Sequence, residues 1–393
     1  MSTDTFSRHP KQWVLALCII LFAISGFESF WAPRELPLTF EESFVIGQQK
    51  SVDASFFMAS PYQIRTDSRQ NIYVAEGQQK TIMMFGSQGT YRRSIGRAGK
   101  GPGEFPSGPI FTFNKEGKIV ALDLVSRRFT WFSKKGDILS EYAPSRPGMV
   151  WSDTFFQSGD SSYLFLKKPQ NMESETGGSY RDYVFHRYSS SFENHIRSFG
   201  AFDKLVPKAG SKFVQMITNR MNAGNIVQTG PDQFWYAPGI YDGKVYQFKR
   251  TTGQWKLGNT YPGSINGKQA VVVGSDEESS ISFVTYGKNG HQQRSEGKIN
   301  SYSIGLVQTN GGKVLHFSGQ RMQHRDSLRT MVEVFNPTGD LIGTGSFDEI
   351  AINRNLGYFS SHDPAIWMDN KNRFYFIDNN NGPVVRVGRI QGL

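Results

Sequence analysis

Short apolar runs separated by glycine, asparagine and aspartate recur along most of the chain, and several of them alternate with polar residues. Runs of this kind predict β-strands joined by tight turns. The pattern is clearest in two segments, Asn71–Gly96 and Gly117–Tyr142. Each has an apolar strand, a turn carrying an acidic residue (Glu76, Asp123), a second strand, a glycine turn and a third strand. Because the two segments match in register at a spacing of about 46 residues, they predict a repeat architecture of the blade type.

The same order of strands can be followed, less regularly, through the rest of the chain. Six repeats begin near residues 62, 110, 153, 225, 304 and 365. Asp67 and Gly89 stand at turn positions, where Asx hydrogen bonding and a positive φ are useful. We therefore predict an all-β fold, a six-bladed β-propeller of four-stranded antiparallel blades. The long segment between the fourth and fifth repeats leaves seven blades as an alternative.

The last repeat lacks a fourth strand, because the chain stops after PVVRVGRI. An open propeller would expose a long unpaired strand edge, which proteins avoid. Near the other end, Phe40–Gly47 (FEESFVIG) reads as a strand with no partner before it, and it resembles the fourth strands of other repeats. We predict that the ring is closed by this N-terminal strand in the last blade, with Ser43–Ile46 beside Val384–Val387.

Composition shifts define the domain organisation. Residues 1–33 form a signal peptide or membrane anchor followed by the extended Pro33–Thr39, and residues 34–393 form the propeller. Polar or irregular insertions are expected at 168–182, 201–223 and 262–300. The second insertion contains a helix-like apolar face, and the third contains two apolar runs, QAVVVG and SISFVTYG, which predict a hairpin.

The apolar segment Trp13–Phe27 carries no charge. At 1.5 Å per residue in a helix it measures roughly 22 Å, short of the ~30 Å hydrocarbon core, which favours a signal peptide. A retained anchor that extends to residue 32 is the alternative. Both predict that the propeller lies outside the cytoplasm, in the periplasm or secreted, and that any membrane contact runs through this segment.

Charge and cysteine content narrow the class of protein further. The single cysteine, Cys18, lies in the apolar leader, so a disulfide-stapled scaffold is excluded. The net charge is +10, with basic pairs in different repeats, such as Arg92-Arg93, Arg127-Arg128 and Lys134-Lys135. Their scatter favours solvated turns over a patch for anionic polysaccharide, lipid headgroups or nucleic acid.

The repeats, above all DSRQNIYVAE, TIMMFGSQG and GRAGKGPGEFPSGPIFTFNKEGKIVALD, resemble the NHL-repeat-like six-bladed propellers of bacterial extracytoplasmic proteins. Gln70 and Asn372 stand where that group usually has glycine, and we expect the difference to affect turn type more than fold. The resemblance implies the propeller fold and a binding habit, and it implies no reaction.

Sequence motifs for catalysis are weak. No GxSxG elbow occurs, and the glycine-rich Gly96–Pro106 lacks the Walker spacing. The run Asp378–Gly382 lacks the order of a calcium loop. The histidines lie in different repeats without metal-ligand spacing, and the strand positions of two of them predict blade packing: His186, His195, His291, His316, His324 and His362. We therefore expect no metal or cofactor, with calcium or zinc as the alternative.

Propellers bind ligands where the inner strands and their loops converge on the axis. The candidate ligand-binding residues from these strands are Arg65, Asp153, Gln228 and Gln308. We predict an extracytoplasmic, monomeric module that binds or scaffolds a protein partner or polysaccharide through its axial face and inserted loops, with no role in nucleic-acid binding. The alternative is a hydrolase or lyase with an axial, metal-assisted site.

Overall fold

The structure is a computed structural model that describes twelve stretches of the chain. These are residues 33–47, 58–144, 152, 154–166, 183–205, 224–265, 271–273, 281–286, 292–321, 328–350, 366–378 and 382–393. The N-terminal segment 1–32, most of the insertions at 168–182 and 201–223, and Asn379–Asn381 of the calcium-like run lie outside them. No helix among the described residues is long and apolar enough to cross a membrane.

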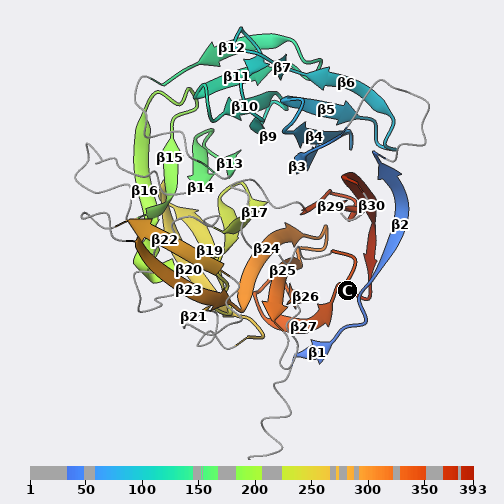
Figure 1. The fold of residues 1–393 in the computed structure, drawn as a ribbon, viewed down its shortest axis with the longest axis vertical. Coiled ribbons are helices and arrows are strands. Elements are labelled where there is room, and N and C mark those ends of the chain that lie inside the picture. Colours follow the sequence, from blue (N-terminus) through green and yellow to red (C-terminus); the bar gives the residue numbers. More distant parts are fainter. Residues whose placement is uncertain are drawn as a thin grey trace, which may run out of the picture.

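Six antiparallel sheets surround a common axis as the blades of a ring (Figure 1). Blade one contains β3 (Pro61–Thr66), β4 (Ile72–Glu76), β5 (Thr81–Phe85) and β6 (Tyr91–Ile95). Blade two contains β9 (Ile110–Phe113), β10 (Ile119–Asp123), β11 (Arg128–Phe132) and β12 (Ile138–Tyr142). Blade three contains β13 (Thr154–Gln157), β14 (Tyr163–Leu166), β15 (Tyr183–Tyr188) and β16 (His195–Ala201), after which comes the short helix α2 (Phe202–Leu205).

The other three blades repeat this order. Blade four contains β17 (Asn225–Gly230), β18 (Gln233–Ala237), β19 (Lys244–Thr251) and β20 (Gln254–Pro262). Blade five contains β24 (Ser301–Gln308), β25 (Val314–Arg321), β26 (Leu328–Phe335) and β27 (Leu341–Ser346). Blade six contains β28 (Ile366–Met368), β29 (Phe374–Asp378) and β30 (Val384–Gln391), and its fourth strand is β2 (Thr39–Ile46). The predicted all-β, six-bladed propeller is confirmed.

The predicted closure of the ring is also confirmed. β2 pairs with β30 in antiparallel register, with Phe44 opposite Val387 and Ile46 opposite Val385. Glu42 and Arg386 form an ion pair across this junction at 2.6 Å. The last blade therefore has strands from both ends of the chain, and β2 covers the edge that β30 would otherwise expose.

Each of the six spaces between neighbouring blades is filled by a hydrophobic cluster of described residues. The space between blades three and four is rich in phenylalanine, and Phe234 and Phe248 stack there with ring centroids 5.0 Å apart. The space between blades six and one contains Ile46 of β2 beside Ile64 and Val385. Burial between the sheets thus continues through the junction of the two chain ends, so the closing strand is part of the core.

The acidic residues that mark the first two repeats have a common structural role. Glu76 ends β4 and accepts hydrogen bonds from the backbone N–H groups of Ala59 and Ser60, on the segment that enters blade one. Asp123 ends β10 and accepts from the N–H and hydroxyl of Ser107, on the segment that enters blade two. Both carboxylates are buried. Each therefore fixes the incoming chain to its blade and satisfies its buried N–H groups.

One expectation about the turns is confirmed and another is wrong. Asp67 does form the predicted Asx turn, because it accepts from the N–H groups of Arg69 and Asn71 at 2.9 Å. The expectation that Gln70 and Asn372 change the turn type is wrong. Their φ angles are 65° and 59°, close to the 73° of Gly117 at the same position in blade two. The turn keeps one left-handed residue in each case, whatever the side chain.

Two further expectations are corrected. The segment read as an extended linker contains β1 (Arg34–Glu35), which pairs in parallel with β27 and makes blade five a five-stranded sheet. The last insertion contains three strands: β21 (Val271–Val273), β22 (Ile281–Tyr286) and β23 (Gln292–Ile299). The predicted hairpin between the first two is wrong, because β23 lies between them and pairs with both. β23 was not predicted as a strand because its sequence QQRSEGK is polar.

The glycine-rich loop Gly96–Pro106 contains two short strands, β7 (Arg97–Ala98) and β8 (Glu104–Phe105), which pair in parallel.

Candidate functional site

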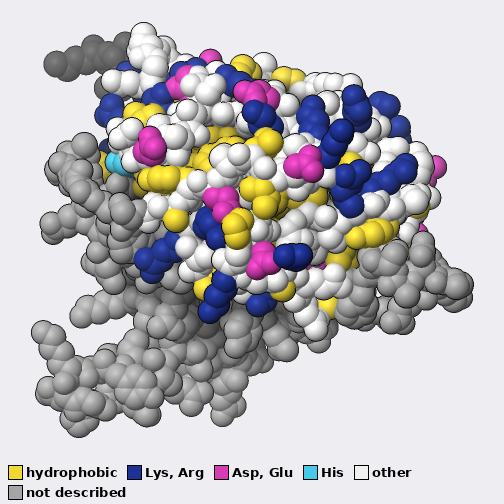
Figure 2. All heavy atoms as spheres, turned by 90° about the horizontal axis from the view of Figure 1, so that it is seen from above, with side chains coloured by type: hydrophobic (Ala, Val, Ile, Leu, Met, Phe, Trp, Pro, Cys, Tyr) yellow, Lys and Arg dark blue, Asp and Glu magenta, His cyan; other side chains and the backbone are white. Residues whose placement is uncertain are grey.

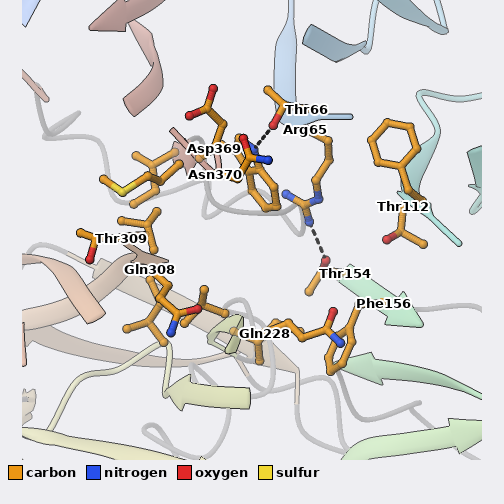
Figure 3. A pocket seen from close by; sticks show the side chains of 18 of the residues that line it. Arg65, Thr66, Thr112, Thr154, Phe156, Gln228, Gln308, Thr309, Asp369 and Asn370 are labelled. Atoms are coloured by element: carbon orange, nitrogen blue, oxygen red, sulfur yellow. Dashed lines mark hydrogen bonds between the residues drawn. The ribbon is translucent and has the colours of Figure 1, made fainter. Parts of the chain in front are cut away.

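A cavity of about 520 Å³ lies on the axis of the ring (Figure 3). It is lined by residues of all six inner strands, β3, β9, β13, β17, β24 and β28. Most of its lining comes from the carboxyl-terminal halves of these strands and from the turns that follow them, such as Thr309–Asn310 and Asp369–Asn370. Its volume is in the range of sites for small organic ligands.

Three of the four residues predicted for the axis line this cavity: Arg65 on β3, Gln228 on β17 and Gln308 on β24. Asp153 lies outside the described residues, and Thr154, which follows it, lines the cavity. Sequence reasoning located the inner strands, so it could select these positions from the expected geometry. That they bind a ligand stays a prediction.

Arg65 is the only basic side chain in the described lining of the cavity. Its guanidinium lies over the ring of Trp367, 4.5 Å from the ring centroid, and donates to the carbonyl of Ile64 at 3.1 Å. It also reaches Thr154 Oγ1 at 3.5 Å. Trp367 is itself held by a 2.9 Å hydrogen bond from Nε1 to Thr66 Oγ1. The stacking orients the cation toward the cavity, as Figure 3 shows.

Asp369 is the only carboxylate in the described lining, and its oxygens are already occupied. It accepts from the backbone N–H groups of Lys371 and Arg373, from the Arg373 guanidinium and from the Tyr375 hydroxyl, all at 2.9 Å or less. Burial of Asp369 raises its pKa, but the hydrogen bonds from Arg373 and Lys371 outweigh this and lower the pKa below its usual value. Asp369 is thus ionised and is not available as a proton donor. Its carboxylate is the hydrogen-bonding centre of its turn, as the carboxylate of Asp67 is in blade one.

The rest of the lining is neutral. Polar groups come from threonine, asparagine and glutamine side chains, and apolar walls from phenylalanine, methionine and aliphatic residues. Gln228 Nε2 donates to the carbonyl of Gln157 at 3.3 Å, which leaves its amide oxygen toward the cavity for a ligand hydroxyl. The described lining contains no histidine, cysteine, serine or lysine, and so no pair of nucleophile and base. The arrangement is suited to binding.

No group of three or more histidine, cysteine, aspartate or glutamate side chains among the described residues could hold a metal ion. His291, His324 and His362 lie outside that part of the chain. His186 and His316 lie in the third and second strands of their blades and are buried, as their positions predicted.

A buried polar cluster between blades four and five was not anticipated. His316 Nδ1 lies 2.9 Å from Glu333 Oε2, and His316 Nε2 lies 3.0 Å from Ser303 Oγ. The order serine, histidine, glutamate resembles a catalytic triad. However, Ser303 is 3% exposed and both of the other residues are fully buried, so no substrate reaches the hydroxyl. The three residues occupy adjacent strands β24, β25 and β26, and their spacing in the sequence gives no signal of contact.

Glu333 is the centre of this cluster. It accepts hydrogen bonds from the Tyr241 hydroxyl at 2.5 Å, from Ser264 Oγ at 2.7 Å and from the Ser264 backbone N–H. Burial raises the pKa of Glu333, but its hydrogen bonds with His316, Tyr241 and Ser264 lower the pKa below its usual value. Burial and the neighbouring Glu333 carboxylate raise the pKa of Tyr241 well above its usual value. The cluster joins blade five to the loop after β18 and to the start of the last insertion, which is a structural role.

Two insertions leave their blades beside residues at the start of neighbouring strands. Leu166, at the end of β14 where the 168–182 insertion departs, pairs with Thr154 at the start of β13. Pro262, where the last insertion departs, pairs with Lys244 at the start of β19. Because neighbouring strands are antiparallel, both departures lie at the end where inner strands begin. Thr154, at this end of β13, also lines the cavity, so the topology does not separate the cavity from the inserted loops. That the two form one binding surface stays a prediction.

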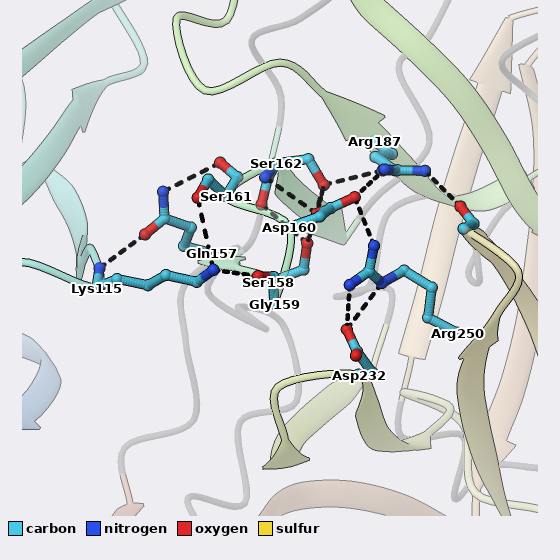
Figure 4. A network of polar contacts seen from close by, with 11 residues as sticks. Lys115, Gln157, Ser158, Gly159, Asp160, Ser161, Ser162, Arg187, Asp232 and Arg250 are labelled. Atoms are coloured by element: carbon cyan, nitrogen blue, oxygen red, sulfur yellow. Dashed lines mark hydrogen bonds and ion pairs between the residues drawn. The ribbon is translucent and has the colours of Figure 1, made fainter.

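A polar network joins the turns of blades three and four on the same face as the cavity (Figure 4). Asp160 lies between two arginines, with an ion pair to Arg250 at 2.8 Å and a second ion pair to Arg187. Arg250 also contacts Asp232 at 2.5 Å. Burial raises the pKa of Asp160, but hydrogen bonds from Ser158 and Ser162 and the charge of Arg187 hold it well below its usual value.

We expect the replacement Asp160→Asn to lower the free energy of unfolding by about 1–2 kcal/mol at neutral pH. The folded-state pKa is depressed, so the ionised carboxylate contributes stability above its unfolded pKa, near 3.9, and this contribution is lost as the pH falls below that value. Urea unfolding of both proteins from pH 7 down to pH 3 tests this, and the two free energies should converge in acid. Asp232→Asn, at a more exposed carboxylate, is the control with a smaller effect. A difference that stays constant with pH would contradict the prediction.

Comparison with known proteins places the chain in a family. A family described as a 6-bladed beta-propeller, DUF5128, matches residues 53–252, about half of the chain. The chain therefore belongs to the DUF5128 family of six-bladed propellers. No curated protein matches it.

Solved structures resemble the chain at low sequence identity. A member of the DUF4221 family from Bacteroides vulgatus has a TM-score of 0.52 and 12% identity, over 91% of this chain and 99% of that one. A virginiamycin B lyase from Staphylococcus aureus has a TM-score of 0.41 and 11% identity, over 89% and 99% of the two chains. A gluconolactonase from Xanthomonas campestris has a TM-score of 0.43 and 11% identity, over 84% and 86%. At 12% identity the likeness to the DUF4221 member shows the fold alone.

Proposed function

We propose that this propeller is a binding module that holds an acidic saccharide, as a free molecule or as a unit of a polysaccharide, in its axial cavity. The observation that carries the proposal is the chemistry of the lining, in which one oriented cation, Arg65, lies among mostly neutral amides and hydroxyls. The one described carboxylate, Asp369, already accepts hydrogen bonds from its own turn. Sugar hydroxyls pair with such groups as both donors and acceptors. A carboxylate or sulfate on the sugar complements the guanidinium.

The apolar part of the lining supports the same ligand class. Phe113, Phe156 and Met368 provide walls against which the C–H faces of a sugar ring can pack. The predicted leader at Trp13–Phe27 and the NHL-like repeats support a protein that works outside the cytoplasm and binds rather than reacts. The hydrolase or lyase alternative finds no nucleophile and base in the described lining. Binding of a protein partner by the insertions stays a separate prediction.

Binding of paired neutral and acidic sugars, such as glucose with glucuronate and galactose with galacturonate, tests the proposal by calorimetry. We expect at least one acidic sugar to bind. Arg65→Ala should weaken that binding by about tenfold to a hundredfold, since a charged hydrogen bond contributes about 1.5–3 kcal/mol, and Arg65→Lys should weaken it less.

Arg69→Ala is the matched control, because Arg69 is an exposed arginine in the turn after β3 and does not line the cavity. It should leave the affinity unchanged. If no sugar in the panel binds, or if a bound sugar is unaffected by Arg65→Ala, the proposed function is wrong.

A further inference from the structure

The outer edge of blades one and two carries an excess of positive charge. Residues 91–142 contain ten lysine and arginine residues against five aspartate and glutamate residues, which accounts for half of the chain's net charge of +10. Figure 2 looks onto this edge and shows lysine and arginine side chains gathered on one side of it, with few acidic side chains among them.

The fold brings together basic pairs that are far apart in the sequence. Arg93 on β6 donates from Nη1 to the carbonyl of Lys135, in the turn between β11 and β12, at 2.6 Å. Ile95 on β6 lies against Gly136 in that same turn. The pairs Arg92-Arg93 and Lys134-Lys135 therefore belong to one surface, and their scatter in the sequence does not separate them in space.

Five of these side chains form the basic rim: Arg92, Arg93, Lys100, Lys134 and Lys135. All five are exposed, and none forms an ion pair with another described residue. The neighbouring cations are different, because Arg97 pairs with Glu104 at 2.8 Å and Arg128 pairs with Glu141 at 3.3 Å. The rim thus has uncompensated charge that attracts an anionic partner.

Protection of strand edges does not explain the rim. Lysine on an edge strand discourages pairing with other chains, and each blade of a propeller has one outer strand to protect. The outer strands β2 and β12 of blades six and two contain no lysine or arginine. The basic residues are concentrated on one part of the ring instead of being distributed to every edge.

We propose that the basic rim binds an anionic polysaccharide, through sulfate or carboxylate groups that contact both blades at once. Guanidinium and ammonium groups match such anions, and a flexible polymer can follow a convex edge. A lipid surface is less suited to this edge. Proteins that bind membrane interfaces insert tryptophan or other aromatic residues. The exposed large hydrophobic side chains described here are aliphatic, and two of them, Ile138 and Leu139, begin the strand that follows Lys134 and Lys135.

The rim is separate from the axial cavity, so this inference does not depend on the proposed function. Affinity for sulfated dextran, measured by fluorescence at low and at physiological salt, tests it. Two rim variants change one blade each: Arg92→Glu with Arg93→Glu, and Lys134→Glu with Lys135→Glu. The control, Arg197→Glu with Lys256→Glu, makes the same change in net charge at exposed positions on the outer strands of blades three and four.

We expect each rim variant to weaken binding by about tenfold or more, and the control by about threefold or less, with all differences shrinking as salt screens the charges. Arg93 also contacts blade two, so the Arg92/Arg93 variant could unfold. In that case the affinity of the Lys134/Lys135 variant for sulfated dextran tests the proposal. An equal loss in the control, or equal binding of neutral dextran, would overturn the proposal. If the protein binds phosphatidylglycerol vesicles but not sulfated dextran, and the rim variants lose the vesicle binding, the rim binds a lipid surface instead.

Discussion

Replacing Glu333 with alanine is expected to lower the free energy of unfolding by about 3–5 kcal/mol. The carboxylate is fully buried between blades four and five and accepts hydrogen bonds from His316, Tyr241 and Ser264. Alanine leaves these buried donors without an acceptor, and an unpaired buried polar group costs more than a lost surface bond. A loss of this size is a large part of the stability of an ordinary domain.

Urea unfolding followed by tryptophan fluorescence measures the effect. The control is Asp348→Ala on the same blade, because Asp348 forms an exposed ion pair with Arg329 at 2.5 Å and should cost less than about 1 kcal/mol. Glu333→Gln keeps an acceptor oxygen and should fall between the two. Equal effects at positions 333 and 348 would show that the buried cluster does not hold the two blades together.

Removal of the closing strand should have an even larger effect. A chain that begins at residue 48 lacks β1 and β2, so β30 loses its partner strand and the space between blades six and one loses Ile46. Phe40 also leaves its edge-to-face contacts with Phe374 and Phe376, at centroid distances of 6.4 and 5.2 Å. Leu38 and Ile46 are both buried and both lost. Because loss of one such side chain costs about 2–5 kcal/mol, the sum is comparable with the whole stability of a domain. We expect no cooperative thermal transition.

A chain that begins at residue 33 retains both strands and should unfold in one transition. A synthetic peptide of residues 33–47, added to the shorter chain, should restore the transition, and a scrambled peptide should not. A shorter chain that melts at the temperature of the control would mean that the junction contributes little to stability.

The sequence was most informative where the chain repeats itself. Blades one and two could be predicted strand by strand, because each strand is bounded by a turn residue with a definite conformational need, such as Asp67 or Gly89. Ring closure followed from one physical argument, that an unpaired edge needs a partner. Positions on the axis, such as Arg65 and Gln308, followed from knowing which strands are innermost.

What could not be predicted depends on contacts between distant parts of the chain. Nothing in the local pattern of Ser303, His316 and Glu333 shows that three neighbouring strands place them side by side. β23 was missed because it is polar, although it has a strand on each side. The prediction that Gln70 and Asn372 change the turn type was wrong. It relied on the preference of glycine, over other residues, for a positive φ. The surrounding turn instead imposes this conformation, and in blade one Arg373 donates to Gln70 Oε1 at 3.2 Å and holds it there.

The pairing of β2 with β30 has a consequence for how the protein is made. Glu42 contacts Arg386 across 344 positions of sequence, so a segment that leaves the ribosome early has a partner that is synthesised much later. Blades one to four can assemble while translation continues, but the first strand must wait with its hydrogen-bonding groups unmatched. The nascent chain therefore has a period of exposure that lasts until β30 is synthesised, and we expect folding during synthesis to depend on chaperones.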